Sequence, residues 1–346
     1  MSNWLGLNYN LSTKISLFLL YILILAGGVV RCTGSGMGCP DWPKCFGMYI
    51  PPTSVDQLPE NYEKIFVEGR IKKNERLSSV LSFFGLNKLS EKIKNDPEIK
   101  KGESFNVFKT WTEYINRLIG ALVGLSLLFV FLCSIFLKPL NRKLILLSFL
   151  SLVLVFFQAW VGSIVVSTNL LSGLITFHVI VALLIICNVI LCYHLSSKND
   201  NNYSRSKPLN FFIVISLTLF IIQMVLGTEV RESVDELLKL YGFNFRENII
   251  ESLNNSFKIH RSFSLLILLF QIMTVVTIYL KFKTHNYFKL LSVLMLVIII
   301  SEILVGAGMA YFSIPKILQP IHLFIAFIAF GLQFYILLLN FSLKKS

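Results

Sequence analysis

Apolar residues along this chain gather in long unbroken runs and do not alternate regularly with polar ones. Eight such runs are each about 20 residues long, which is the length that an α-helix needs to cross the hydrocarbon core of a bilayer. The pattern predicts an all-α integral membrane protein with eight transmembrane helices. The predicted helices are 14–31, 115–137, 143–166, 173–195, 209–230, 260–281, 287–311 and 317–341.

Composition supports this prediction and excludes an ordinary soluble domain. Hydrophobic residues make up 55% of the 346 residues, a share well above that of soluble globular proteins. The first run follows Lys14 as the apolar part of a signal peptide would, but no small-residue cleavage site follows it. It ends instead in Gly27, Gly28 and Arg31, and we interpret it as a retained helix.

Basic residues mark one side of the predicted membrane protein. They occupy the short loops between alternate helices and the C-terminal end, against a single acid, Asp200. By the positive-inside rule these loops and both termini are predicted to be cytoplasmic, in a multi-pass protein of the cell (inner) membrane. The net charge of +13 then reflects topology and indicates no nucleic-acid partner. The basic residues are Lys138, Arg142, Lys143, Lys198, Arg205, Lys207, Lys281, Lys283, Lys344 and Lys345.

The opposite side carries the longer loops, where function is expected. The first loop, about 32–110, mixes Lys and Glu with apolar residues such as Phe83 and Phe84. This mixture predicts one or two amphipathic helices lying on the membrane surface. A solvated spacer without a function of its own is the alternative.

The two halves of the chain repeat each other at a fixed offset. After the long loop the offset is 144, and before it the offset is 200 because the first half carries extra loop residues. The repeat predicts two tandem pseudo-symmetric four-helix bundles, 14–195 and 209–341. The matching pairs are Asn116 with His260, Arg117 with Arg261, Gly162 with Gly306, His178 with His322, Gly27 with Gly227 and Arg31 with Arg231.

Histidines at the outer helix ends indicate a metal ligand set. His260 and His322 begin two parallel helices of one bundle at equal depth, which is the arrangement that two axial ligands of one heme iron require. For each histidine alone, a hydrogen bond to a neighbouring helix is the alternative. The spacing of 62 residues from His260 to His322, repeated from Asn116 to His178, favours heme.

Two other histidines have no repeat partner. His194 and His285 lie at predicted cytoplasmic helix ends, and we interpret each as a histidine that is hydrogen-bonded to a neighbouring helix. Two intramembrane carboxylates, Glu229 and Glu302, also need a reason to be there because a charge in lipid is costly. Glu302 matches Gln158 in the repeat, which suggests a hydrogen-bonding role between helices, so we interpret both carboxylates as structural.

Three features together resemble the heme A synthase family. They are the run GGVVRCTGSGMGCPDWPKCFG from Gly27 to Gly47, the segment TEYINR from Thr112 to Arg117, and the repeated histidines. The resemblance extends over nearly the whole chain except about residues 50–105. It implies an oxidoreductase that converts a methyl group of heme O into the formyl group of heme A, which terminal oxidases use.

The resemblance also implies which half binds which heme. The C-terminal half is expected to hold a heme b cofactor between His260 and His322, and the N-terminal half to receive heme O. His178 matches one N-terminal ligand, whereas Asn116 stands where many members have histidine. An iron held by His178 alone has an open sixth position that suits an oxidation site, and loss of the heme position is the competing interpretation.

Further residues gain expected roles from the family. Glu113 matches a carboxylate that is important there, and three residues before Asn116 it lies on the same helical face, where it could relay protons. A carboxylate near a helix N-terminus is also favourable on its own. Arg117 and Arg261 could pair with heme propionates or anchor their helices at the interface.

Cys39 and Cys45 are predicted to form a disulfide, as the family resemblance supports and as the non-cytoplasmic side permits. Both a structural role and a redox role for this pair remain open.

The other function classes are a di-histidine b-type cytochrome that passes electrons from a quinol and a non-catalytic heme carrier. The Gly27 to Gly47 motif and Glu113 favour the enzyme. Expected partners are heme O, membrane lipid, a heme O synthase and an electron partner, with a homo-oligomer left open.

Overall fold

The computed structural model describes residues 2–102, 104–137, 140–168, 170–171, 173–197, 205–242, 248–283 and 285–342. Helices form nearly all the regular structure in these ranges, and the one isolated β-bridge joins Cys45 and Met48. Part of the predicted orientation rests on residues outside the described ranges, namely Lys138, Lys198, Asp200, Lys344 and Lys345.

Eight of the described helices are long and apolar enough to cross a membrane, which confirms the predicted membrane fold. Their apolar runs are continuous because most of their side chains face lipid and few face water. They are α1 (Ser2–Cys32), α4 (Val107–Ile135), α5 (Arg142–Ser167), α6 (Leu174–Ser196), α7 (Lys207–Tyr241), α9 (Asn255–Lys281), α10 (Asn286–Tyr311) and α11 (Leu318–Phe341).

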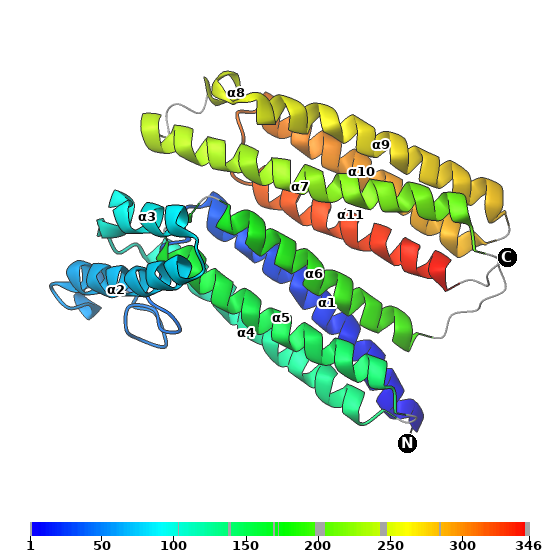
Figure 1. Ribbon diagram of the computed structural model, residues 1–346, viewed down its shortest axis with the longest axis horizontal. Coiled ribbons are helices and arrows are strands. Elements are labelled where there is room, and N and C mark those ends of the chain that lie inside the picture. Colours follow the sequence, from blue (N-terminus) through cyan, green and yellow to red (C-terminus); the bar gives the residue numbers. More distant parts are fainter. Residues whose placement is uncertain are drawn as a thin grey trace.

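These helices pack in two groups that lie side by side (Figure 1). In the first, α1 packs on α4 and α6, and α5 packs on α4 and α6. In the second, α9 packs on α7 and α10, and α11 packs on α7 and α10. The groups meet where α11 contacts α1 and α6 and where α6 contacts α7. The N-terminal end of α1 and the C-terminal end of α11 lie at the end of the molecule away from α2 and α3 (Figure 1).

Small residues let the two groups approach closely. A Cβ added at Gly28 of α1 would lie 3.0 Å from Cα of Pro320 in α11. A Cβ at Gly331 of α11 would collide with the hydroxyl of Tyr21 in α1. Without a hydrophobic force between helices in lipid, such close backbone packing is a main source of association. The predicted retained helix α1 is therefore a packed part of the molecule.

Charged side chains join the same groups at the outer end. Asp235 of α7 accepts from Arg31 of α1 at 3.0 Å and lies 2.7 Å from Arg231 on its own helix. Arg231 also donates to Gln319 of α11 at 2.8 Å. The two arginines match in the repeat, so one carboxylate connects equivalent positions of both halves.

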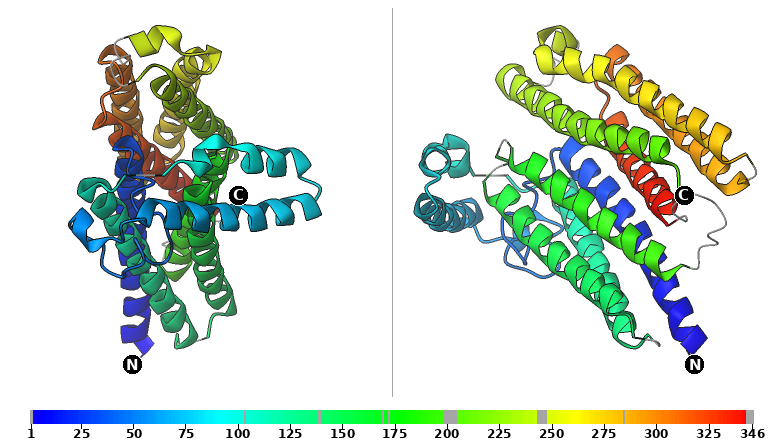
Figure 2. Two further views of the ribbon diagram at one scale, coloured as in Figure 1. Left: turned by 90° about the vertical axis from the view of Figure 1, so that its left-hand side faces the viewer. Right: turned by 45° about the vertical axis from the view of Figure 1, so that its right-hand side comes forward.

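The long first loop contains helices, as the sequence predicts. They are η1 (Val55–Gln57), α2 (Tyr62–Phe83), α3 (Asn87–Asn95) and η2 (Pro97–Lys100). Figure 2 shows α2 and α3 running across the direction of the long helices at one end of the bundle. Asn74 of α2 donates to the carbonyl of Ser167 at the end of α5 at 2.6 Å, which attaches the loop to the bundle. Its position on a membrane surface stays a prediction.

Several helices are longer than predicted. α1 begins at Ser2, well before the predicted start at 14. α7 continues to Tyr241, beyond the predicted end at 230, and the short α8 (Ile249–Ser252) follows. α9 begins at Asn255 and α4 at Val107, several residues before the predicted starts. These extensions mix polar with apolar residues, so a search for unbroken apolar runs misses them although the helices continue. His260 consequently lies in the second turn of its helix.

Candidate functional site

His260 and His322 lie opposite each other on α9 and α11. Their ring centres are 6.3 Å apart, and the ring planes are inclined by 77°. Two imidazoles that bind one metal from opposite sides, at about 2 Å per metal–nitrogen bond and about 1.1 Å from nitrogen to ring centre, have ring centres about 6 Å apart. The separation therefore fits two axial ligands of one metal.

A glycine on a neighbouring helix makes room for each of these rings. A Cβ at Gly227 of α7 would lie 3.1 Å from Cε1 of His260, and a Cβ at Gly306 of α10 would lie 3.2 Å from Cε1 of His322. Both distances are shorter than ordinary van der Waals contact. A larger residue than glycine would require each imidazole to shift by a few tenths of an ångström.

The first half repeats this arrangement. A Cβ at Gly162 of α5 would lie 3.5 Å from Cε1 of His178, and one at Gly27 of α1 would lie 3.9 Å from Oδ1 of Asn116. Asn116 thus occupies the position that corresponds to His260. The sequence repeat therefore has a direct structural counterpart in the helix pairs around all four side chains.

Glutamine side chains fix the helices that carry two of the histidines. Gln223 of α7 donates to the carbonyl of His260 at 3.0 Å, and Gln158 of α5 donates to the carbonyl of His178 at 2.8 Å. In a lipid environment such hydrogen bonds between helices satisfy polar groups that have no water to bind. These hydrogen bonds fix the position of each histidine along its helix axis relative to the neighbouring helix.

The buried polar atoms of this site lack partners among the described residues. The Nδ1 atoms of His178, His260 and His322 and Oδ1 of Asn116 are buried and make no hydrogen bond. Native proteins rarely leave such atoms unsatisfied, and the exceptions gather at ligand and redox sites. Imidazoles that are polar, close together and unsatisfied fit a bound metal group better than a packing role.

A heme suits this donor set. Within the described residues no three His, Cys, Asp or Glu side chains gather into a metal site. His260 and His322 offer two nitrogens on opposite sides, and a porphyrin supplies its own nitrogens around the iron. In the first half the matching pair offers one imidazole, His178, and the weakly donating amide of Asn116.

Glu113 lies in a second cluster, beside the predicted disulfide. Cys39 and Cys45 are bonded, which confirms their pairing. Glu113 is 3% exposed; its Oε2 accepts from the backbone N–H of Cys39 at 2.7 Å, and its Oε1 pairs with Arg117 one turn along α4. The carboxylate therefore connects α4 to the disulfide loop.

Arg117 is held by the same loop. Its guanidinium donates to the carbonyls of Cys39 at 2.9 Å, Asp41 at 2.6 Å and Lys44 at 3.0 Å. A heme propionate would have to compete with these acceptors for Arg117. Arg261, its repeat partner, is exposed and lies 5.9 Å above the ring of Phe257. The propionate role stays a prediction for both arginines.

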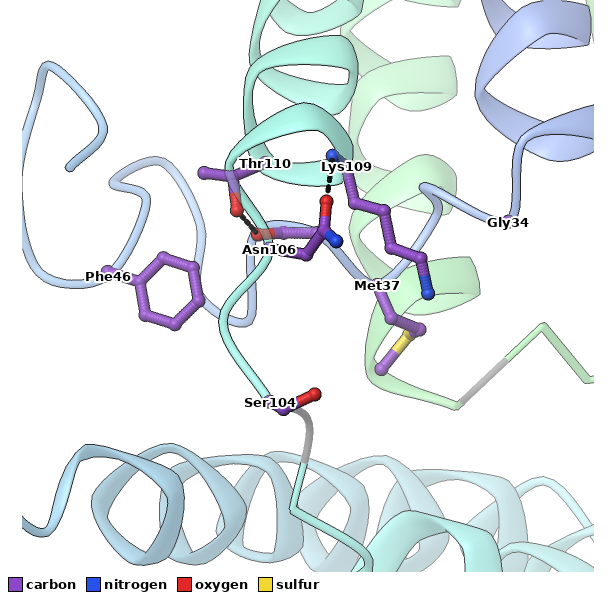
Figure 3. Close-up of a pocket in the computed structure, with 8 residues that line it drawn as sticks. Gly34, Met37, Phe46, Ser104, Asn106, Lys109 and Thr110 are labelled. Atoms are coloured by element: carbon purple, nitrogen blue, oxygen red, sulfur yellow. Dashed lines mark hydrogen bonds between the residues drawn. The ribbon is translucent and has the colours of Figure 1, made fainter. Parts of the chain in front are cut away.

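A small pocket opens next to the disulfide loop (Figure 3). Thr110 donates to the carbonyl of Gly38 there at 2.9 Å, and Asn106 caps α4 by accepting from the N–H of Lys109 at 3.0 Å. Gly38 packs so tightly on the backbone of Lys109 that a Cβ has no space. No histidine is among its described lining residues, which are Gly34, Met37, Gly38, Phe46, Ser104, Asn106, Lys109 and Thr110.

Sequence reasoning overlooked one close neighbour of a histidine. Oε1 of Glu302 in α10 lies 3.0 Å from Nδ1 of His322 in α11. The match of Glu302 with Gln158 in the repeat suggested a hydrogen-bonding role between helices, but it did not indicate that a histidine ring is the neighbour. His194 lies 2.5 Å from the hydroxyl of Ser342 at the end of α11, as expected for a histidine that is hydrogen-bonded to a neighbouring helix.

Comparisons with known proteins cover this whole architecture. A family model described as cytochrome oxidase assembly protein, COX15-CtaA, matches residues 12–73 and 86–334. A heme A synthase of Ehrlichia canis (strain Jake) is 28% identical, over 91% of this chain and 88% of its own length. A heme A synthase of Rickettsia prowazekii (strain Madrid E) is 23% identical, over 93% of this chain and 96% of its own length. Because the family model matches both groups of helices and the disulfide loop that follows α1, the chain belongs to the COX15-CtaA family.

Proposed function

We propose that the protein is a heme A synthase, an enzyme of heme A formation. The observation that carries the proposal is that equivalent positions of the two halves hold two residue pairs. His260 and His322 form a complete ligand pair, and Asn116 and His178 form an incomplete one. A complete pair holds an iron firmly, whereas an incomplete pair leaves one coordination position open. One bundle thus suits a resident cofactor and the other a reacting substrate.

We further propose heme O as the substrate in the first half and heme b as the cofactor in the second. Bound heme b would supply one-electron redox chemistry through its iron. Conversion of the substrate methyl group into a formyl group adds an oxygen atom and removes electrons and protons. His178 would hold the substrate iron.

Glu113 is the proposed acceptor of a proton released near the outer end of α4. Its burial beside the disulfide loop keeps it out of bulk water, and it lies on the same helix as Asn116, one turn away. Arg117 holds the loop and the carboxylate in one cluster. A proton acceptor must be positioned close to the reacting group before its acidity matters.

Two other function classes make different predictions. A b-type cytochrome that only transfers electrons needs the pair His260 and His322 but not Glu113 or the open position beside Asn116. A heme carrier needs neither a firmly ligated pair nor a buried carboxylate. The relatives named as heme A synthases also favour the enzyme.

The test is product formation in membranes. The protein is expressed in a host that makes heme O but no heme A, and extracted hemes are separated and identified by mass. The proposal predicts heme A with the wild-type chain and none with an empty vector. Abundant heme O with heme b as the only other heme would reject the synthase and favour the electron-transfer cytochrome.

In the proposed orientation the basic ends of the helices and both termini are cytoplasmic. Eight crossings bring both chain ends to one side, opposite the loop that carries Cys39 and Cys45. The non-cytoplasmic position of this loop suits its disulfide. Cysteine labelling from each side of sealed vesicles tests the orientation, with new cysteines at Lys207 and Lys88 expected to react from opposite sides.

A further inference from the structure

Glu302 and His322 form the closest carboxylate–imidazole contact of the candidate site. Oε1 of Glu302 and Nδ1 of His322 are 3.0 Å apart, with the two side chains 14% and 22% exposed. This is hydrogen-bonding distance, although the two groups are not aligned as a hydrogen bond and Oε2 of Glu302 has no partner. Nδ1 of His322 likewise makes no hydrogen bond in the structure, so Oε1 of Glu302 is the acceptor nearest to it.

The repeat shows that this carboxylate is particular to the second half. Its equivalent in the first half is Gln158, which donates to the carbonyl of His178 at 2.8 Å and leaves the imidazole nitrogen alone. His260 likewise receives its hydrogen bond from an amide, that of Gln223, at its backbone carbonyl. Among these three described histidines, only His322 has a carboxylate at its ring nitrogen.

A carboxylate at this position has a defined chemical effect. It accepts the proton of Nδ1, so the lone pair of the neutral ring is fixed on Nε2, which becomes the metal donor. It also makes the imidazole more basic, and a stronger donor stabilises the oxidised metal more than the reduced one. The cost of burying the carboxylate in the membrane is offset by the contact with the ring.

We propose that Glu302 is a positioning residue that fixes Nε2 of His322 as the iron donor and lowers the reduction potential of the heme in the second half. The two axial ligands, His260 and His322, are then electronically unequal. This inference rests on the proposed heme between these histidines and deepens it. The site becomes a better electron donor than one with two ligands of the His260 type.

The main test replaces Glu302 by the residue that the repeat itself uses, Glu302→Gln. Purified wild-type and variant proteins are titrated for the midpoint potential of their b-type heme, and electron paramagnetic resonance records the axial ligand field. The variant is expected to keep its heme, to titrate at a higher potential and to show changed g values. Glu229→Gln, which removes another helix carboxylate that contacts Ser256, is the matched control and is expected to match the wild type.

An independent measurement needs no substitution. In the reduced low-spin protein with ¹⁵N-labelled histidine, the inference predicts that one axial Nδ1–H is strongly hydrogen-bonded and the other is not. Equal resonances for both axial ligands, or an unchanged potential and unchanged g values in Glu302→Gln, overturn it. A wild-type protein that binds no heme rejects the proposed cofactor instead, so the two failures are distinguishable.

Discussion

Gly227 lies directly against the imidazole of His260, so closely that a Cβ on this glycine would be 3.1 Å from Cε1 of the ring. Gly306 has the same relationship to His322 at 3.2 Å. Each glycine belongs to the helix that packs beside the histidine helix, so the ring position depends on the neighbour as much as on its own rotamer. The positions of both imidazole rings are therefore sensitive to a single methyl group added to the facing glycine.

Gly227→Ala is expected to displace the His260 ring and to weaken heme binding. Overpacking of this kind costs about 1–3 kcal/mol, which corresponds to a fall in affinity of roughly 5- to 150-fold. The heme content of purified protein, measured by its optical spectrum, checks this. Gly124→Ala is the control because nothing lies within 4 Å of its added Cβ. Equal heme content in both variants would show that the glycine contact has no influence on binding.

Glu113→Gln is expected to lower heme A formation by about 10²-fold or more, the usual contribution of a positioned proton acceptor. The amide oxygen can still accept from the N–H of Cys39, so the disulfide loop should keep its place. Heme A is quantified in membranes, while limited proteolysis of the loop reports its attachment. Wild-type product formation in this variant would remove Glu113 from the chemistry, and a loosened loop with lost activity would indicate a structural role.

Asp235→Asn is expected to destabilise the contact between the two halves. It removes the charge that lies between Arg31 and Arg231, and hydrogen bonds to charged groups contribute about 1.5–3 kcal/mol each. We expect a thermal transition lower by several degrees in detergent. Glu236→Gln removes an equal charge one residue along α7 from an exposed side chain and should leave the transition unchanged. Equal transitions for both variants would show that the ion cluster does not hold the halves together.

Much of the membrane fold follows from sequence pattern because each span must be apolar along nearly its whole length. The internal repeat predicts which residues occupy equivalent positions in the two halves. In the structure the four repeated glycines, Gly27, Gly162, Gly227 and Gly306, each face one of the four repeated ligand positions. The disulfide between Cys39 and Cys45 was also predictable. The apolar requirement of a membrane span, the internal repeat and the pairing of two nearby cysteines each leave few alternative structures.

Contacts that depend on the rotation of one helix against another were not predictable. The repeat aligns Glu302 with Gln158, but it does not say which atom of the next helix either side chain reaches. The outer end of α7 was missed for a different reason, because polar residues such as Asp235 carry no apolar signal although the helix continues. Likewise the three loop carbonyls around Arg117 follow from the path of the loop, which local pattern does not encode.

The most direct test of heme binding between His260 and His322 compares the hemes of the wild type with those of His260→Ala, His322→Ala and His285→Ala. His285 serves as the control. It caps the N-terminus of α10 by accepting from the N–H of Phe288 at 3.4 Å, and it follows the end of α9, whereas His260 lies near the start of that helix. The account predicts a low-spin heme b with two imidazole ligands in the wild type and in His285→Ala, and loss of this spectrum in the other two variants. The same spectrum in all four proteins would contradict it, as would a wild type that contains no heme.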